Sequence, residues 1–316
     1  MASKAEWTSR DVPDQTGRAF VITGSSGGIG LETARVLAQR GGDVVLACRN
    51  LDKATAARAD ILATAPDAAV EVGLLDLSSL ASVREFADWM HSNNRPLDVL
   101  INNAGIMAVE HTITEDGFES QLGVNHLGHF ALTGLLVERL LESEAPRVVT
   151  MSSLAHRSGT IAFDDLMSAR RYKPFGAYGQ SKLANLLFTM ELQRRFRRVG
   201  RSDALALACH PGLASTNLAS NIAPGLLQRA AKLTERFAPN LGQAAAEGAV
   251  PTLRAATDPE VNGGDYLGPS QMMESRGPAV KVKARPKAYD VHDARGLWEA
   301  SIELTGVTYN ALTPAT

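Results

Sequence analysis

"TGSSGGIG", residues 23–30, lies between a short apolar run and a longer amphipathic stretch, and it decides how the chain is expected to fold. The preceding RAFVIT (18–23) is continuously apolar and β-branched, as a buried strand is, and the following IGLETARVLAQR (29–40) has helical periodicity. A glycine-rich turn between such a strand and helix leaves free N–H groups at the helix start, where the helix dipole favours a phosphate. The turn therefore predicts a phosphate-binding α/β unit.

The alternation of strands and helices continues along most of the chain. Apolar runs predict further strands at 43–47, 70–75, 97–102, 147–151 and 204–209, with DYLG (265–268) as a possible seventh, and amphipathic stretches between them, including a long helix over 116–141, predict helices. Continuous apolar strands joined by right-handed crossover helices form a parallel sheet that is covered on both faces. We therefore expect an α/β fold with a Rossmann-like, doubly wound parallel sheet of about seven strands.

The domain organisation is expected to be simple. Residues 1–16 form a polar N-terminal arm, and residues 17–316 read as one catalytic domain that ends with a helix around 290–304. No apolar run precedes Phe20 and no segment approaches 18 apolar residues, which predicts neither a signal peptide nor a membrane span and points to the cytoplasm. The net charge of −2 argues against nucleic acid or an anionic membrane as a partner. Cys48 and Cys209 are expected to be reduced, buried thiols.

A series of short motifs follows the glycine-rich turn. The glycines are spaced Gly24-x-x-x-Gly28-x-Gly30, and NNAG (102–105), Asn125, Ser153, Tyr178-x-x-x-Lys182 and Pro211-Gly212 with Thr216 come after them in that order. Over about residues 17–270 this series resembles the short-chain dehydrogenase/reductase family. The phrases VVLACRN, SSLAH and YGQSKLANLLF resemble the branch of that family that includes the retinol dehydrogenases and WW-domain-containing oxidoreductase.

The tyrosine and lysine of "YGQSK" (178–182) suit the reduction of a carbonyl group. Hydride reduction needs a proton donor for the oxygen, and a tyrosine with a pKa of about 10 donates reluctantly without help. Lys182 lies one helical turn after Tyr178, where an ammonium group would lower that pKa. The resemblance implies that Tyr178 is the acid/base, that Lys182 also binds the nicotinamide ribose, and that Ser153 positions the substrate carbonyl.

Two neighbouring polar residues bear on the expected catalytic group. The resemblance implies that Asn125 links Lys182 to solvent through a water-mediated proton relay, and the alternative for Asn125 is a buried structural role in its helix. Ser152 is adjacent to Ser153, but side chains alternate along a strand, so the two serines should point in opposite directions. We expect Ser153 to face the site.

The end of the second strand predicts which nicotinamide cofactor is used. It carries no carboxylate to bind a free ribose, and Arg49 could pair with a 2′-phosphate, which favours NADP(H) over NAD(H), unless Arg49 is an ordinary solvated arginine. Asp76 could contact the adenine or cap a turn, and residues 103–105 could make room for the adenosine ribose or simply pack tightly. The full set of cofactor-binding residues that the resemblance implies is Gly24, Ser26, Gly28, Ile29, Gly30, Arg49, Asn50, Asp76, Leu77, Asn103, Ala104, Gly105, Tyr178, Lys182, Pro211, Gly212 and Thr216.

Two segments are expected to shape the substrate site. The stretch between Ser153 and Tyr178 is longer than is common in the family, so its 157–176 loop should border the substrate mouth. Residues 217–239 read as an amphipathic lid or as a core helix, and an apolar lid would suit a small apolar ketone, aldehyde or alcohol. The resemblance implies a homodimer or homotetramer that pairs through the Tyr178 helix and the helix after it. The alternative function is an NADPH-binding regulatory sensor with little turnover, although a sensor would not need Tyr178.

Several other residues have ordinary explanations. His126 and His129 are three residues apart, near metal-ligand spacing, but the sequence offers no third ligand nearby, so we predict no metal site. His156 and His210 flank the predicted site and are expected to form hydrogen bonds in loops. The basic run at 193–201 closes a helix, where positive charge suits the C-terminal dipole, and predicts no nucleic-acid surface.

Overall fold

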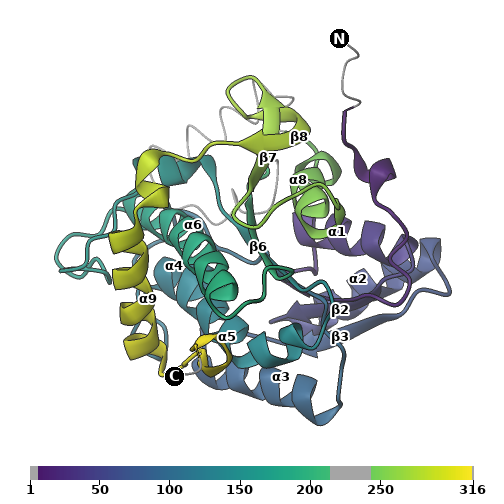
Figure 1. Ribbon diagram of the computed structural model, residues 1–316, viewed down its shortest axis with the longest axis horizontal. Helices are drawn as coiled ribbons and strands as arrows, with labels where there is room; N and C mark the ends of the chain where they lie inside the picture. The colour runs from purple at the N-terminus through teal and green to yellow at the C-terminus, as the bar shows by residue number, and fades with distance from the viewer. Residues whose placement is uncertain (1–5, 214–242, 315–316) are drawn as a thin grey trace.

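The computed structural model describes residues 6–213 and 243–314. Within them, eight strands form one sheet in the order β3-β2-β1-β4-β5-β6-β7-β8, and all neighbours pair in parallel except β7 and β8 (Figure 1). The strands are β1 Ala19–Thr23, β2 Asp43–Cys48, β3 Val70–Leu74, β4 Val99–Asn102, β5 Arg147–Met151, β6 Leu205–Cys209, β7 Tyr266–Gln271 and β8 Arg276–Val282. The expected single α/β domain with a doubly wound sheet is confirmed, with one strand more than predicted.

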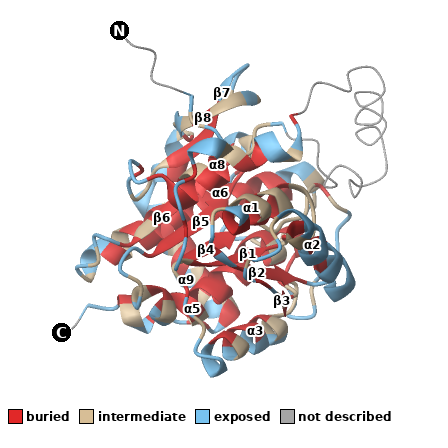
Figure 2. Ribbon diagram, turned by 90° about the vertical axis from the view of Figure 1, so that its right-hand side faces the viewer, coloured by how far each residue is buried: buried red, intermediate tan, exposed pale blue. Residues whose placement is uncertain are grey.

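The central strands are apolar along their whole length because helices cover both faces of the sheet. Every residue of β1, β4 and β5 is buried, and Figure 2 shows these strands inside the molecule. In register, Val21 of β1 lies between Val45 of β2 and Leu100 of β4. The strand order reverses direction between β1 and β4, and in open α/β sheets a ligand binds at the carboxyl ends of the strands at such a point. The fold therefore places a crevice where the glycine-rich turn begins.

Two helical layers enclose the sheet. The α1, α2 and α8 helices share one apolar cluster with the sheet, and α3, α5 and α6 share the cluster on the opposite face. The helices are α1 Gly28–Gln39, α2 Leu51–Thr64, α3 Leu80–Ser92, α4 Ser120–Leu122, α5 Gly128–Leu141, α6 Pro174–Arg198, α8 Ala245–Thr257 and α9 Val291–Thr305, with the π-helix η2 Gly123–Leu127 and the short 3-10 helices η1 Ser9–Asp11, η3 Leu154–Ser158, η5 Pro286–Tyr289 and η6 Asn310–Leu312.

The C-terminal helix α9 packs along the outside of α6 (Figure 1). Trp298 of α9 stacks on Phe188 of α6 with ring centroids 5.8 Å apart, and the Arg195 guanidinium lies 4.2 Å from the centre of the Trp298 ring. Because α9, the sheet and the neighbouring short helices surround α6, every one of its residues from 177 to 193 is buried, although the helix is 25 residues long. Helix α9 of the same chain therefore covers one side of α6, which is one of the two helices through which pairing with a second subunit is predicted.

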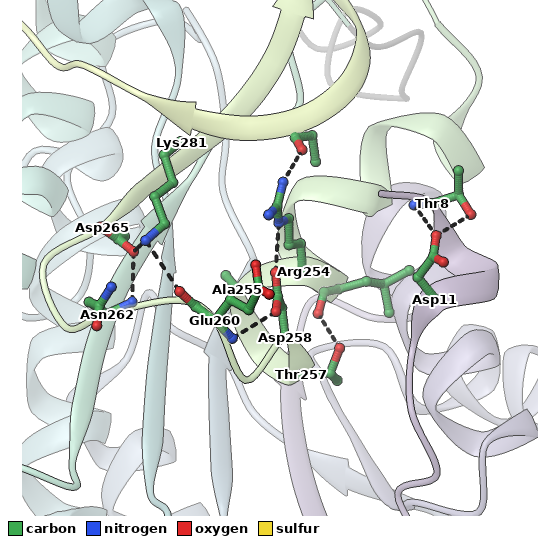
Figure 3. A network of polar contacts seen from close by, with 12 residues as sticks. Thr8, Asp11, Arg254, Ala255, Thr257, Asp258, Glu260, Asn262, Asp265 and Lys281 are labelled. Carbon is green, nitrogen blue, oxygen red and sulfur yellow. Dashed lines mark hydrogen bonds and ion pairs between the residues drawn. The ribbon is translucent and has the colours of Figure 1, made fainter. Parts of the chain in front are cut away.

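Polar contacts fasten β8 to the rest of the domain. Arg254 of α8 pairs with Asp258 at 2.9 Å and donates to the carbonyl of Ala279 in β8 at 2.5 Å, while Lys281 of β8 pairs with Asp265 at 2.7 Å (Figure 3). Neither β8 nor α8 is among the elements that the sequence pattern predicts. Strand β8 is an antiparallel edge strand, so its exposed positions give it no continuous apolar run.

The predicted long helix over 116–141 is interrupted. Its first part is the short α4 followed by the π-helix η2, and regular α-helix begins only at Gly128. A built Cβ on Gly128 would lie 2.5 Å from the carbonyl oxygen of Leu77, so α5 approaches the β3–α3 loop closely enough to require glycine there. The π-helical turn contains Asn125, and such turns are frequent at functional sites.

Candidate active site

The glycine-rich turn lies at the carboxyl end of β1. Gly24 and Gly28 have φ angles of +66° and +57°, which favour glycine. A Cβ on Gly24 would lie 2.8 Å from the Cβ of Ala104, and one on Gly30 would lie 2.6 Å from Asn103 Nδ2, so both contacts exclude a side chain. A Cβ on Gly27 would meet nothing within 4 Å. The first turn of α1 therefore has open space above it, which fits an anionic group at the helix N-terminus.

The residues of the NNAG motif brace this turn from β4. Asn103 Nδ2 donates to the carbonyl of Thr23 at 2.8 Å, and the backbone N–H groups of Asn103 and Ala104 both donate to Thr23 Oγ1 at 2.9 Å. Ile29, also predicted as a cofactor contact, has its side chain in the apolar core, whereas Ser26 is half-buried. Tight packing is thus one reason for the small residues at 103–105.

The carboxyl ends of β2 and β3 bring together an arginine and an aspartate. The Arg49 side chain is 75% exposed, and its Nε lies 4.0 Å from Asp76 Oδ2. Asp76 Oδ1 accepts hydrogen bonds from the N–H and the hydroxyl of Ser78, so the turn-capping role left open for Asp76 is present. Asn50 Oδ1 caps α2 by accepting from the Lys53 N–H at 2.8 Å. Arg49, which is predicted to bind the cofactor, therefore extends its charged group into solvent.

The Asn125 side chain links two walls of the site. It is fully buried; its Nδ2 donates to the Ile106 carbonyl and to Ser181 Oγ, both at 2.9 Å, and its Oδ1 accepts from the Ile106 N–H at 2.8 Å. These bonds join the loop after β4 to α6. The π-helical turn lets Asn125 reach both partners while its own carbonyl stays within 3.0 Å of His129 Nδ1.

Tyr178, Lys182 and Ser153 converge beside Asn125. The Tyr178 phenol is close enough to the Ser153 hydroxyl for that group to lower its pKa, and Lys182 Nζ lies 5.7 Å from the centre of the Tyr178 ring. Lys182 Nζ donates to the Met151 carbonyl at 3.2 Å, and a Cβ on Gly105 would lie 3.3 Å from that nitrogen. The structure thus brings the four predicted catalytic residues together where β4 and β5 end.

Burial dominates the electrostatics of this group. It lowers the pKa of Lys182 from 10.5 to about 8, because the ammonium loses its hydration. Burial also raises the pKa of Tyr178, and the nearby Ser153 hydroxyl opposes that rise. The sequence predicts that Lys182 lowers the pKa of Tyr178, whereas in the structure desolvation of the phenol has the larger effect.

The 157–176 loop is fastened beside this group. Tyr172 donates its hydroxyl to the Val109 carbonyl at 2.8 Å and accepts from Gln121 Nε2 at 2.7 Å, and its ring packs at a tilt against His111, with centroids 4.6 Å apart. Gln121 Oε1 also accepts from the N–H of Ala108, whose φ is +49°. No sequence motif singles out Gln121 or Tyr172, and only the unusual length of the loop could have drawn attention to Tyr172.

The Pro211-Gly212 turn follows β6. Gly212 has a φ of +70°, and a Cβ on it would lie 2.3 Å from the carbonyl oxygen of Ser275. The β7–β8 hairpin therefore lies directly against this turn. Thr216 and the predicted lid at 217–239 lie outside the described residues.

The histidines with metal-ligand spacing are held by hydrogen bonds. His126 Nε2 lies 3.0 Å from Ser301 Oγ, and His129 Nε2 lies 2.8 Å from Thr23 Oγ1. Burial lowers the pKa of His126 to about 4 and that of His129 to about 3, so both rings are neutral at pH 7. Across residues 6–213 and 243–314 there is no group of three His, Cys, Asp or Glu side chains arranged to hold a metal ion. Over the same ranges, none of the helices combines the length and apolarity that crossing a membrane requires.

The chain is similar in sequence and in fold to known proteins. A family model described as short chain dehydrogenase matches residues 18–226. Mouse retinol dehydrogenase 12 is 42% identical over 295 residues, which cover 93% of this chain and 88% of that protein, and human retinol dehydrogenase 13 is 49% identical over 64% of this chain and 60% of its own length. The crystal structure of an uncharacterised protein from Mycobacterium paratuberculosis superposes with a TM-score of 0.80 at 44% identity, over 96% of this chain and 99% of that one.

Proposed function

The chain belongs to the short-chain dehydrogenase family, in a branch that resembles the retinol dehydrogenases, and from this premise we propose that it is an NADP(H)-dependent oxidoreductase interconverting an apolar ketone or aldehyde and its alcohol. The observation that carries the proposal is the convergence of Ser153, Tyr178, Lys182 and Asn125 at the carboxyl ends of β4 and β5. A buried phenol paired with a hydroxyl, beside a buried ammonium, is the donor set that carbonyl reduction requires.

The residues present fit a nicotinamide dinucleotide. The open helix start above Gly27 would hold the pyrophosphate, and the buried Lys182 ammonium, which donates to the Met151 carbonyl, has further N–H groups for a ribose hydroxyl. The exposed Arg49 supports NADP(H), because a planar guanidinium can bind a 2′-phosphate through two hydrogen bonds and a free ribose offers it no charge. When bound, the nicotinamide would supply or accept the hydride.

The side chains of this chain would handle the oxygen and its proton. In reduction, the Ser153 hydroxyl and the Tyr178 phenol hydrogen-bond the substrate oxygen, and Tyr178 transfers its proton to that oxygen as negative charge develops there. The raised pKa of Tyr178 keeps the phenol protonated before reaction. Lys182, with a pKa of about 8, carries a proton at neutral pH and stabilises the resulting phenolate. Asn125 holds the loop after β4 and α6 at the spacing that this transfer needs.

An apolar substrate is supported by the segments that border the site. Phe175 precedes Tyr178 by three residues on α6, so both side chains lie on one face of the helix, and Phe175 is 40% exposed. Leu213, directly after Gly212, is 49% exposed. Apolar side chains left open beside polar catalytic groups are typical of sites for small, mostly apolar ligands.

The test is an NADPH-oxidation screen against ketones, aldehydes, steroids and quinones, run with the wild type and Tyr178→Phe. We expect Tyr178→Phe to lower kcat/KM by about 10²- to 10⁴-fold while NADPH binding persists. Tyr309→Phe is the matched control, because Tyr309 is also a buried tyrosine with a hydrogen-bonded hydroxyl, donated to the Phe130 carbonyl at 2.7 Å. Turnover that survives in Tyr178→Phe contradicts the mechanism, and an inactive wild type that still binds NADPH favours a sensor.

A further inference from the structure

Two fully buried histidines lie behind the site, and the mechanism above uses neither. His156 follows β5 and lies in η3, and His210 follows β6 directly. Both rings pack on Tyr266 of β7, with centroids 5.6 Å and 5.1 Å from the tyrosine ring. The two loops that they occupy carry Ser153 and the Pro211-Gly212 turn. The histidines therefore stand between the sheet and the two loops whose placement the reaction depends on.

The hydrogen bonds of His156 define where its proton lies. The backbone N–H of Arg285 donates to His156 Nε2 at 3.3 Å, so Nε2 is an acceptor and the hydrogen of the neutral ring is on Nδ1. Nδ1 then donates to the carbonyl of Ser153 at 2.6 Å, and the same carbonyl accepts from the His156 backbone N–H at 3.0 Å. The Arg285 side chain donates to the carbonyls of Arg157 and Gly159 at 2.6 and 2.9 Å, which holds η3 against this segment.

The hydrogen bonds of His210 place its proton on the other nitrogen. The backbone N–H of Gly212 donates to His210 Nδ1 at 3.2 Å, so Nδ1 is the acceptor. Nε2 then carries the hydrogen; it lies 3.2 Å from Glu274 Oε2 without forming a hydrogen bond, and Arg157 Nη2 lies 2.8 Å from the same carboxylate oxygen. Glycine at 268 makes room for this ring, because a Cβ there would lie 2.0 Å from His210 Nε2.

We propose that His156 and His210 are positioning residues held in opposite tautomers, His156 fixing the backbone of Ser153 by donation from Nδ1 and His210 fixing the amide of Gly212 by acceptance at Nδ1. The proposal rests on the proposed function, because it assigns Ser153 to the substrate and Gly212 to the cofactor. The tautomer of His156 is selected by the Arg285 N–H, which follows the β7–β8 region, and that of His210 by the Gly212 N–H, with the Glu274 carboxylate of the β7–β8 turn 3.2 Å from the other nitrogen of that ring. The C-terminal part of the domain thereby helps to position two loops that lie more than 50 residues earlier in the sequence.

Both rings are neutral under the conditions in which the enzyme is expected to work. Burial lowers the pKa of each ring, and for His210 to about 3. The charged groups that face them are Arg157 and Arg285 beside His156, and Arg157 and Glu274 beside His210. A neutral ring is required at both positions, because a protonated imidazole has no acceptor for the N–H of Arg285 or of Gly212.

Asparagine and glutamine substitutions test the roles of the two ring nitrogens of each histidine separately. The amide of asparagine places a donor or acceptor near Nδ1, and that of glutamine places one near Nε2. At both positions we therefore expect the asparagine variant to stay within about 3-fold of the wild-type kcat/KM and the glutamine variant to lose about 10- to 100-fold, as for removal of a buried hydrogen bond. His156→Gln should lower mainly kcat, and His210→Gln should raise mainly the KM for NADPH. His91→Asn and His91→Gln, at an exposed histidine on α3, are matched controls.

Nitrogen-15 NMR of the histidine-labelled full chain tests the tautomers without turnover. We expect the hydrogen on Nδ1 in His156 and on Nε2 in His210, each assigned by loss of its signal in the corresponding asparagine variant. The same tautomer in both rings overturns the proposal, as do glutamine variants that match or exceed their asparagine counterparts in NADPH binding or turnover. If the wild type binds NADPH but reduces no carbonyl, the proposed reaction fails, while NMR and NADPH affinity still decide the role of the histidines.

Discussion

The Ser152 hydroxyl donates to the backbone carbonyl of Lys182 at 2.9 Å, so the serine next to the proposed catalytic serine is engaged with α6. Ser153 instead accepts from the Ala155 N–H at 3.2 Å and lies beside the Tyr178 phenol, whose pKa it lowers. Two adjacent hydroxyls thus have different surroundings: Ser152 fastens the helix that carries Lys182, and Ser153 is the one proposed to face the reacting oxygen.

The two alanine substitutions are predicted to differ in their effect on activity. Ser153→Ala should lower kcat/KM by about 10²- to 10³-fold, as loss of a donor to a developing oxyanion does; it should also lower the free energy of unfolding by about 1 kcal/mol, because Ser153 Oγ caps η3 by accepting from the Ala155 N–H. Ser152→Ala should lower the free energy of unfolding by about 1 kcal/mol and leave kcat/KM within a few-fold of wild type. Steady-state kinetics and urea unfolding of both variants check this, and equal loss of activity in the two would contradict the assignment.

The burial of Lys182 predicts a pH-dependent cost in stability. Its pKa is about 8 in the folded chain and 10.5 as the ordinary value, so between these pH values the unfolded chain binds more protons and the free energy of unfolding rises with pH. Below pH 8 the whole cost is present, about 3 kcal/mol. Lys182→Met should therefore be inactive yet more stable than wild type at pH 7, with the difference shrinking toward pH 10. Lys53→Met, at an exposed position on α2, should show no such pH trend.

Arg49 is predicted to discriminate between the two nicotinamide cofactors. Arg49→Ala should raise the KM for NADPH by about 10- to 100-fold, since a charge-assisted hydrogen bond contributes about 1.5–3 kcal/mol, and should leave the KM for NADH unchanged. Lys53→Ala removes a nearby exposed charge and serves as the control. An unchanged KM for NADPH in Arg49→Ala would leave the 2′-phosphate without its proposed partner, and the competing contact would be the pairing of Arg49 with Asp76.

The 157–176 loop is predicted to act on the substrate and not on the cofactor. Tyr172→Phe removes the hydroxyl that joins this loop to Val109 and Gln121. The KM for the carbonyl substrate should change by about 5- to 50-fold, with the dissociation constant of NADPH preserved. Tyr289→Phe, which also removes a hydroxyl bonded to backbone, is the control. Deletion of residues 163–172 should shift substrate preference in the same way, and loss of NADPH binding in either variant would argue for a general structural role.

The parts of the fold that the sequence could predict are those where local pattern and burial agree. The strands at 43–48 and 147–151 are predictable almost to the residue, because parallel strands covered on both faces must be apolar throughout. The β8 strand and the break in the 116–141 helix could not be predicted in this way. An edge strand is patterned by one face only, and a π-helical turn depends on bonds that Asn125 makes with Ile106 and Ser181, residues distant in the sequence.

The candidate site likewise has residues that the sequence predicts and residues that it does not. Motif order predicts the four catalytic residues, and the structure brings those four side chains close together. Three neighbouring residues could not be predicted from the sequence, because each contacts a partner far along the chain and none belongs to a recognisable motif. They are Gln121, Tyr172 and Glu274. The sequence marks His156 and His210 as flanking residues, but only the positions of the Arg285 and Gly212 N–H groups reveal which nitrogen of each ring holds the proton.

The packing of α9 over α6 has a consequence for how the protein folds during its synthesis. The helix that carries Tyr178 and Lys182 is complete once residue 198 has left the ribosome, but its outer wall is made by residues 291–305. Until that helix is synthesised, Phe188 lacks the Trp298 ring that stacks on it. A nascent or proteolytically shortened chain without α9 would therefore offer this surface to chaperones, and the proposed activity should appear only after α9 has been synthesised.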